Sequence, residues 1–256
     1  MADKELSWKY AEDFVIESPA LGTARQHALE LGIDPISPAV GAQLAVLAAA
    51  SSTHSILEIG TGTGGMLHTL LTRGMHARGV EINPALIAES RTWYGDLPVQ
   101  AVTGVALPFP DATFDLAVSF DVFEHIRDSD AHLREVARVL RPGGRYLVQT
   151  PSKWPNTVFE TIRWKSLTRW RDDHCALHTP AQLRRRLDAH GFSARFFDVP
   201  VVNEFFRHKV RRHLGWPGAL ALTLANPDRL PVGWRTNLYV EATIASPATY
   251  RATAAR

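Results

Sequence analysis

Short unbroken runs of apolar residues alternate along this chain with longer segments whose apolar residues recur every three or four positions. The short runs are typical of buried strands and the longer segments of amphipathic helices. In Asp130–Leu140, for example, the apolar stripe is Leu133, Val136, Ala137 and Leu140. The pattern predicts strands at Ser55–Ile59, Ala77–Ile82, Val99–Val102, Phe114–Phe120, Arg145–Gln149, Ser193–Val199 and Thr236–Ala245.

Turn and cap residues set the bounds of the predicted helices. Asn83 before Pro84, and Thr179 before Pro180, match an N-cap followed by proline at the first helical position. Further helices are predicted at Ser37–Ala50 and Met66–Arg73, and Pro142–Gly143–Gly144 is expected to end the helix at Asp130–Leu140. Strands and helices in alternation predict an α/β fold, an open and mostly parallel sheet with helices on both faces.

Composition fits one globular domain. The 256 residues are 45% apolar and 21% charged, which argues against a disordered or fibrous chain. The single cysteine, Cys175, excludes an intrachain disulfide and a thiolate metal cluster. No apolar run approaches the roughly 18 residues of a membrane span, and the acidic start of the chain is unlike a signal peptide. These features predict a cytoplasmic protein.

Charge is unevenly distributed. Residues 1–150 carry 11 Lys and Arg against 18 Asp and Glu, whereas residues 151–216 carry 13 against 6 and include four tryptophans. A basic, aromatic surface suits an anionic or lipidic partner, or it is an ordinary solvated helix face. Peripheral membrane contact stays open. No nucleic-acid partner is expected, because no RNA-binding module is recognisable.

A glycine-rich loop follows the first predicted strand. Gly60 and Gly62 allow a ligand to approach the backbone closely, and the next helix offers free N–H groups to an anionic group. Gly60-x-Gly62-x-x-Gly65 also satisfies the dinucleotide fingerprint, with Glu81 21 residues after Gly60 to bind ribose hydroxyls. The loop alone therefore fits an NAD(P)-dependent oxidoreductase as well as a nucleoside cofactor.

Glu58 separates the two hypotheses. Two residues before the first glycine, its carboxylate would repel a pyrophosphate but suits a cofactor with a cationic amino group and a sulfonium. The acid-x-Gly-x-Gly-x-Gly pattern formed with Gly60, Gly62 and Gly64 resembles the first motif of class I S-adenosylmethionine-dependent methyltransferases. Leu107–Leu116 (LPFPDATFDL) and Val136–Gly144 (VARVLRPGG) resemble the ubiquinone/menaquinone-type group of these enzymes.

This resemblance implies a Rossmann-like, doubly wound sheet of seven strands with the last strand antiparallel. It implies S-adenosylmethionine as cofactor, the glycine loop around its methionine part and Glu81 on its ribose. The residues expected at the cofactor are Glu58, Gly60, Thr61, Gly62, Gly64, Glu81, Ile82, Thr103, Gly104 and Phe120. The group usually has an acid near position 103 for the adenine amino group, and here Thr103 offers a hydroxyl instead.

The front of the chain, with Ser37–Gly41 (SPAVG) and Leu70–Met75 (LLTRGM), resembles catechol-type O-methyltransferases. Those enzymes use a divalent cation held by carboxylates. Here Asp121 lies one position beyond the expected place and Gln149–Thr150 replaces Asp-Asn, so we expect no metal. We predict a single domain over 1–256: a helical cap (1–50), a cofactor-binding core (51–200), substrate-side insertions (151–176 and 200–235) and a final strand (236–245).

His125 is the candidate general base, since it follows the fourth strand and its imidazole suits proton transfer near neutral pH. Glu124 is expected to orient it; packing of His125 against the next helix is the alternative. Asp172, Asp173, His174 and His178 have ligand-type side chains, but an acid–His pair before a TPxxL segment is common in this group as a structural element.

The function predicted from the sequence is a metal-independent S-adenosylmethionine-dependent methyltransferase. The expected reaction is O-methylation of a small organic or lipid-linked acceptor. Two alternatives remain at this point: an NAD(P)-dependent oxidoreductase, and a non-catalytic regulatory protein that keeps the cofactor pocket. The sequence does not predict the oligomeric state.

Overall fold

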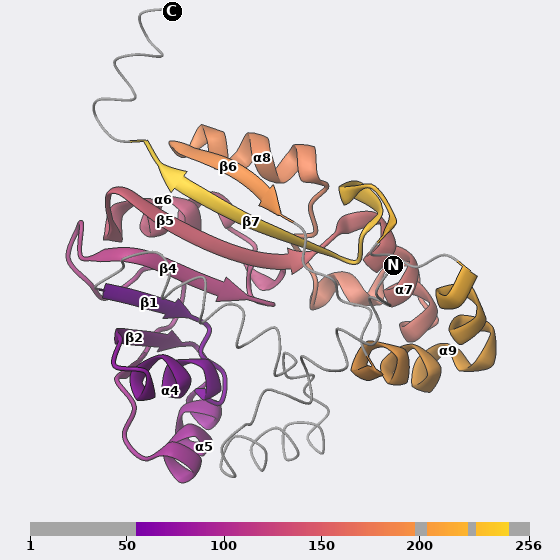
Figure 1. Cartoon of the computed structure of the whole chain (residues 1–256), viewed down its shortest axis with the longest axis horizontal. Helices are drawn as coiled ribbons and strands as arrows, with labels where there is room; N and C mark the ends of the chain where they lie inside the picture. Colours follow the sequence, from indigo (N-terminus) through magenta and orange to yellow (C-terminus); the bar gives the residue numbers. More distant parts are fainter. Residues whose placement is uncertain (1–54, 198–203, 225–228, 246–256) are drawn as a thin grey trace, which may run out of the picture. The chain divides into compact units, whose positions relative to one another are not determined.

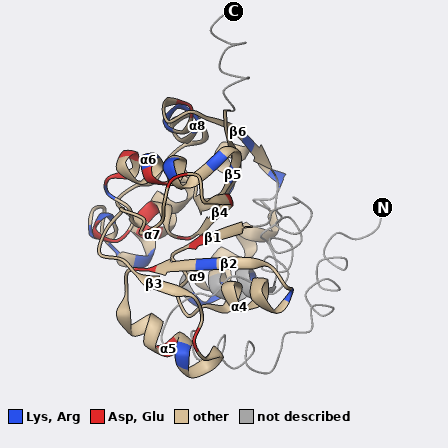
Figure 2. Ribbon diagram, turned by 90° about the vertical axis from the view of Figure 1, so that its left-hand side faces the viewer, with Lys and Arg blue, Asp and Glu red and all other residues tan. Residues whose placement is uncertain are grey.

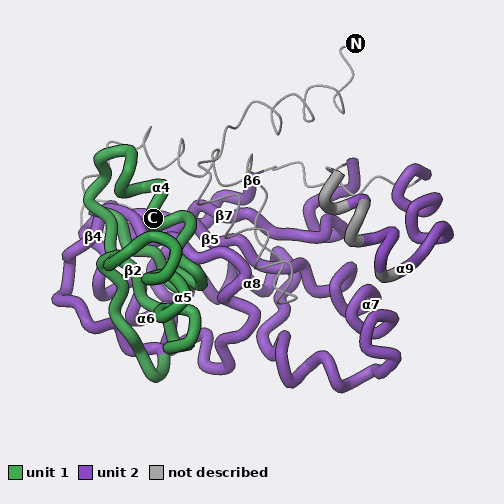
Figure 3. Tube along the Cα trace, turned by 90° about the horizontal axis from the view of Figure 1, so that it is seen from below, with its two compact units in different colours: residues 1–104 green, residues 105–256 purple. Residues whose placement is uncertain are grey.

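The computed structural model describes residues 55–197, 204–224 and 229–245 (Figure 1). The cap predicted over residues 1–50, including the helix predicted at Ser37–Ala50, lies outside the described residues. The chain divides into two compact units, residues 1–104 and 105–256, which Figure 3 colours separately.

The described part of the first unit is a three-stranded parallel sheet with two helices. Strand β2 pairs with β1 on one side and with β3 on the other, both in parallel. Residues 56–59 of β1 are all buried, as the unbroken apolar run predicts. The elements are β1 (Ser55–Ile59), α4 (Gly65–Thr72), β2 (His76–Glu81), α5 (Pro84–Tyr94) and β3 (Val99–Ala101).

Helix α5 begins where the local sequence predicts. The Asn83 side chain caps it by accepting a hydrogen bond from the Ala85 N–H, and Pro84 occupies the first helical position. The missing N–H of proline costs nothing there, because the first helical amides have no partner within the helix. The helix stops before Gly95. The predicted start of this element is therefore confirmed.

The described part of the second unit contributes four strands: β4 (Phe114–Phe120), β5 (Leu140–Pro151), β6 (Phe192–Phe197) and β7 (Asn237–Ile244). Strand β4 pairs with β5 in parallel, whereas β7 is antiparallel to both β5 and β6. Over the described residues the strand order is β3-β2-β1-β4-β5-β7-β6. The predicted Rossmann-like sheet of seven strands with an antiparallel last strand is confirmed.

The helices of the second unit connect these strands. The 3-10 turn η1 and helix α6 link β4 to β5, and α8 precedes β6. Their bounds are η1 (Phe123–His125), α6 (Ser129–Val139), α7 (Lys153–Trp164), η2 (Arg169–Asp172), α8 (Pro180–Ala189), α9 (Glu204–Leu224) and η4 (Val232–Trp234). Figure 2 shows acidic and basic positions on both α6 and α8.

The prediction that the Pro142–Gly144 segment separates a helix from a strand is wrong. Helix α6 ends at Val139, and β5 runs from Leu140 through this segment to Pro151. Leu140 pairs with Phe114 of β4, and the register shifts before the next pair. Pairing with β4 therefore holds the proline and both glycines at an irregular start of the strand.

The two predicted insertions contain helices. Residues 151–176 hold α7 and η2 after the last residue of β5, and residues 200–235 hold α9 and η4. Helix α9 is interrupted at Gly215, which has a φ of 64° and precedes Pro217 by two residues. None of the described helices combines the length and the apolar character that crossing a bilayer requires.

Candidate functional site

The glycine loop between β1 and α4 bends sharply and leaves one side open. Gly62 and Gly64 have φ values of 53° and 82°, in the left-handed region that favours glycine. A Cβ on Gly64 would stand 2.5 Å from the Ser90 hydroxyl oxygen, so a side chain does not fit there. Among the described residues, a Cβ on Gly62 would meet nothing within 4 Å. The loop is therefore packed against the protein at Gly64 and accessible at Gly62.

Glu81, at the end of β2, fastens this loop to the start of α5. One carboxylate oxygen accepts a hydrogen bond from the Gly62 N–H at 2.8 Å. The other accepts from the N–H groups of Ile82 and Asn83, each at 2.9 Å. A carboxylate has room for about four such bonds, so Glu81 can still accept one from a ligand hydroxyl. The residue predicted to bind ribose thus also positions the loop.

Glu58 is a buried acid with an unsatisfied oxygen in the described part of the first unit. Its residue is 5% exposed, and its Oε2 atom has no hydrogen-bond partner among the described residues. Burial, followed by repulsion from the Glu81 carboxylate, raises the pKa of Glu58 to about 8. A buried carboxyl without a cation is unfavourable. A cationic ligand beside it would restore the ionised form, so this carboxyl fits the amino group of S-adenosylmethionine.

The other predicted cofactor residues are dispersed. The Thr61 hydroxyl is buried and has no hydrogen-bond partner among the described residues, whereas Ile82, Thr103 and Gly104 are exposed. Phe120 is half-buried at the end of β4 and belongs to the second unit. The structure therefore brings together Glu58, Glu81 and the glycine loop. The individual roles of all these residues stay predictions.

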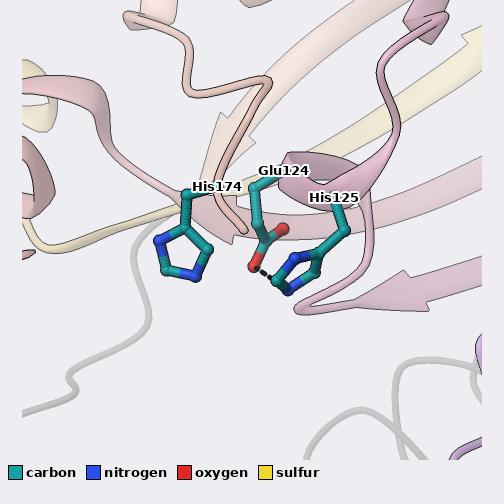
Figure 4. Close-up of side chains that lie close together, drawn as sticks. All are labelled: Glu124, His125 and His174. Carbon is teal, nitrogen blue, oxygen red and sulfur yellow. Dashed lines mark ion pairs between the residues drawn. The ribbon is translucent and has the colours of Figure 1, made fainter. Parts of the chain in front are cut away.

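A cluster of polar side chains follows β4 in the second unit (Figure 4). Glu124 is 1% exposed, and one of its carboxylate oxygens accepts a hydrogen bond from the Thr150 hydroxyl at 3.1 Å. Its other oxygen lies 3.9 Å from His125 Nε2. Burial and the nearby Asp121 carboxylate raise the pKa of Glu124 well above its usual range. The Glu124 carboxyl therefore lies near His125 and is held by the neighbouring strand, and its orienting role stays a prediction.

The His125 ring has a defined tautomer. Its Nδ1 lies 2.9 Å from the backbone carbonyl oxygen of Asp173 and 3.2 Å from the Asp173 carboxylate. A carbonyl oxygen only accepts hydrogen bonds, so Nδ1 carries the hydrogen and donates it. In the neutral ring the lone pair is then on Nε2. The His125 side chain is 40% exposed, so a ligand can reach the ring that carries this lone pair.

His174 joins the cluster through the connection between η2 and α8. Its ring centroid lies 5.1 Å from that of His125. The segment is fastened there because the Glu124 carbonyl oxygen accepts from the Ala176 N–H at 2.8 Å. Burial, and then the neighbouring His125, lower the pKa of His174. His178 instead packs against the ring of Phe123. The four ligand-type residues that are close in sequence, Asp172, Asp173, His174 and His178, therefore do not form one cluster in the structure.

Sequence reasoning missed the partners that strand pairing supplies. Gln149 of β5 pairs with Phe120 of β4, and its side-chain amide donates to Asp121 at 2.9 Å. Thr150 is the next residue of β5 and donates to Glu124. The only available signal was two polar residues at the end of an apolar strand.

A concave surface beside the cluster encloses a volume of about 600 Å³, and several positively charged side chains line it. Cys175, directly after His174, contributes to it. The charged residues in its lining include Arg127, Lys153, Arg185, Arg186 and Asp130. Asp130 is paired with Arg186 at 3.0 Å. The excess of positive charge suits a ligand with an anionic group.

Comparison with known proteins identifies the family. A family model described as "Methyltransferase domain" matches residues 32–195, more than half of the chain. The chain therefore belongs to this methyltransferase family and is a class I S-adenosylmethionine-dependent methyltransferase by fold and family. The resemblance found in the motifs is confirmed, as is S-adenosylmethionine as the cofactor of the family. The oxidoreductase alternative finds no support in these matches.

Individual relatives cover only parts of the chain. An O-methyltransferase of Aspergillus sclerotiorum is 30% identical over 130 residues, 48% of each chain. The ubiquinone biosynthesis O-methyltransferase of Aeromonas salmonicida is 28% identical over 59% of this chain and 69% of its own. The chain covers less than half of the length of the first curated relatives that it matches.

Solved structures show the same fold at low sequence identity. The crystal structure of a SAM-dependent methyltransferase from Archaeoglobus fulgidus superposes with a TM-score of 0.54 at 17% identity. The match covers 80% of this chain and 92% of that protein. A likeness at this level concerns the fold, and the chemistry has to be argued from the site.

Proposed function

We propose that this protein transfers a methyl group from S-adenosylmethionine to an oxygen atom of a small organic or lipid-linked acceptor. The observation that carries the proposal is the buried Glu58 carboxyl next to the glycine loop, with one oxygen lacking a partner among the described residues. The names of two relatives, both O-methyltransferases, support oxygen as the atom methylated.

The first unit supplies residues that fit the cofactor. When bound, S-adenosylmethionine provides an electrophilic methyl group on a sulfonium. Glu58 would bind the cationic amino group, and Glu81 would accept a hydrogen bond from a ribose hydroxyl. The accessible side of the loop at Gly62 gives the ligand room to approach the backbone.

The second unit supplies a proton acceptor. An acceptor hydroxyl loses its proton on methylation, and His125 Nε2 would take that proton. Asp173 positions the ring by accepting from Nδ1. The buried Glu124 carboxyl lies at 3.9 Å from Nε2, and in its ionised form it would stabilise the imidazolium. No metal takes part in this scheme.

The basic concave surface supports an acceptor with an anionic part. Arg127, Lys153 and Arg185 line it, and side chains of this kind bind carboxylate or phosphate groups. Exposed apolar side chains on α7, namely Trp154, Val158 and Ile162, suit an apolar tail or a membrane surface. Both features agree with a lipid-linked acceptor.

Three measurements test the proposal. Titration calorimetry should show micromolar binding of S-adenosylmethionine and none of NAD or NADP; the opposite result would overturn it. Labelled methyl transfer to an extract, followed by mass identification of the product, then names the acceptor. His125→Asn should lower kcat by about 100-fold or more while cofactor binding is unchanged. His76→Asn, at an exposed position in β2, is the matched control and should keep full activity.

A further inference from the structure

Three ligand-type side chains of the second unit converge around one point (Figure 4). Glu124 and His125 belong to η1, and His174 follows η2. One ligand atom from each lies within 4.8 Å of the ligand atoms of the other two. Two imidazole nitrogens and a carboxylate oxygen form the donor set of many three-ligand zinc sites. The proton transfer proposed above needs Glu124 and His125, but it gives His174 no part.

The spacing is close to that of ligands on a shared ion. Zinc keeps nitrogen and oxygen ligands at about 2.0–2.2 Å, so two ligand atoms in a tetrahedral site stand about 3.3 Å apart. The 3.9 Å between Glu124 Oε1 and His125 Nε2 is slightly longer. The ligand atoms of all three residues lie within 4.8 Å of one another, so ion binding requires side-chain rotations that draw them closer together.

The surrounding contacts are those expected around metal ligands. A ligating histidine almost always donates its second ring N–H to a carbonyl or carboxylate, which fixes the lone pair on the other nitrogen. His125 donates its Nδ1 hydrogen to Asp173, so Nε2 is available. Ligating carboxylates are likewise hydrogen-bonded, as Glu124 is by Thr150.

A simple ion pair does not account for the arrangement. Glu124 is almost completely buried, and within the described part of the chain its only ion-pair contact is the long one with His125. His174 is 15% exposed, and its ring lies beside the Glu124 carboxyl (Figure 4). A shared cation would compensate the buried carboxylate and give the second imidazole a partner.

We propose that Glu124, His125 and His174 bind a divalent transition-metal cation such as Zn²⁺ or Co²⁺. Two imidazole ligands favour these ions over Mg²⁺ and Ca²⁺, which prefer sites made of oxygen atoms. Three protein ligands leave a position open for water. The exposed edge of His125 gives the ion a route of entry.

Ion binding regulates the reaction of the same site, an inference that rests on the proposed function. The His125 Nε2 lone pair cannot bind a metal and accept the acceptor's proton at the same time. Zn²⁺ is therefore an inhibitor of methyl transfer, and a chelator reverses the inhibition. Cofactor binding does not respond to the ion, because none of the three ligands belongs to the glycine loop or to Glu81.

The test is a Co²⁺ titration of the chelator-treated full chain, followed by visible absorption. Wild type should develop the intense d–d bands of a four- or five-coordinate ion, and calorimetry with Zn²⁺ should give a matching site. His174→Gln should weaken the affinity by on the order of 100-fold, and Thr150→Val by about 10-fold. His178→Gln, in the same connection but outside the cluster, is the matched control and should keep the wild-type spectrum.

Two results would overturn the metal site: no d–d bands in the wild type, or equal Zn²⁺ affinity in His174→Gln and His178→Gln when circular dichroism shows both folded. Inhibition that persists in His174→Gln would overturn the regulatory role. Failure of the proposed function looks different, because chelated wild type would then neither bind S-adenosylmethionine nor transfer methyl groups, whatever the Co²⁺ titration shows.

Discussion

At the scale of single residues, Glu58 places ligand binding and stability in opposition. Its carboxyl is buried, one oxygen lacks a partner among the described residues, and the Glu81 carboxylate is close enough to oppose its ionisation. The unfolded chain has no such restriction, because there the carboxyl is in water. Retaining an acid here makes the folded protein less stable at neutral pH but prepares a partner for a cation.

This opposition predicts the pH dependence of stability. The folded pKa of Glu58 is raised from 4.5 to about 8, so the folded state holds the proton more tightly. The free energy of unfolding should therefore be highest below about pH 4.5 with respect to this group. It should fall as pH rises toward 8, by at most about 1.4 kcal/mol per pH unit. In Glu58→Gln this contribution to the slope should be lost, together with binding of S-adenosylmethionine, while the contribution of the buried Glu124 carboxyl should remain.

Urea unfolding at pH 5.5 and pH 8 measures the slope for both proteins. Asp96→Asn, at an exposed position in the same unit, is the control and should retain the wild-type slope and cofactor affinity. An unchanged slope in Glu58→Gln would show that the carboxyl is not buried in the folded state.

At the scale of elements, α6 fastens the LPFPD segment that first suggested the family. Arg138 donates to the carbonyl oxygens of Leu107 and Phe109, at 2.9 and 2.8 Å. It also binds the carboxylates of Asp111 and Glu135. The Glu135 carboxylate in turn accepts from the Leu107 N–H at 2.8 Å. In this chain the segment's visible role is structural, since its backbone is held by one arginine and one glutamate of the helix.

Removal of this arginine should be destabilising in a pH-dependent way. Hydrogen bonds with Arg138 lower the pKa of Glu135 to about 2. The stabilisation is therefore complete above the unfolded pKa of about 4.5 and disappears as pH falls toward 2. Arg138→Met should lower the free energy of unfolding by about 2–4 kcal/mol at pH 7 and by much less near pH 2.

Thermal melts at the two pH values check this prediction. Arg134→Met, at an exposed position of the same helix, should change little at either pH. If both arginine variants behaved alike, the hydrogen bonds to residues 107–111 would contribute nothing to stability.

At the scale of the whole molecule, folding and cofactor binding should be coupled. A ligand that binds only the folded state stabilises it by about 2.7 kcal/mol at 100 times its Kd. For a chain of this size we expect S-adenosylmethionine to raise Tm by about 5–10 °C. NAD should leave Tm unchanged.

Gly62→Ala is the informative variant for this coupling. Gly62 has a φ of 53°, which strains alanine, and a Cβ there would occupy the accessible side of the loop. We expect the Tm shift with S-adenosylmethionine to fall below 1 °C. Gly74→Ala, which carries a similar φ of 77° outside the loop, controls for backbone strain and should retain the shift. Loss of the shift in both variants would contradict a specific role of the loop.

The sequence by itself determined the order of strands and helices, the glycine loop and the family. Apolar periodicity, N-caps and glycines act over a few residues, so a linear pattern records them: the bounds of β4 and the cap of α5 follow directly from it. The irregular start of β5 was the exception, since Leu140 is held in the strand by pairing with β4.

Tertiary structure alone decided which side chains surround His125. Parallel pairing of β4 with β5 brings Gln149 to Asp121 and Thr150 to Glu124, and the backbone bond from Ala176 to Glu124 brings His174 within reach. These partners lie 26 to 52 positions apart in the chain. Contacts over such separations depend on strand register and chain return, which no local pattern of apolar and polar residues encodes.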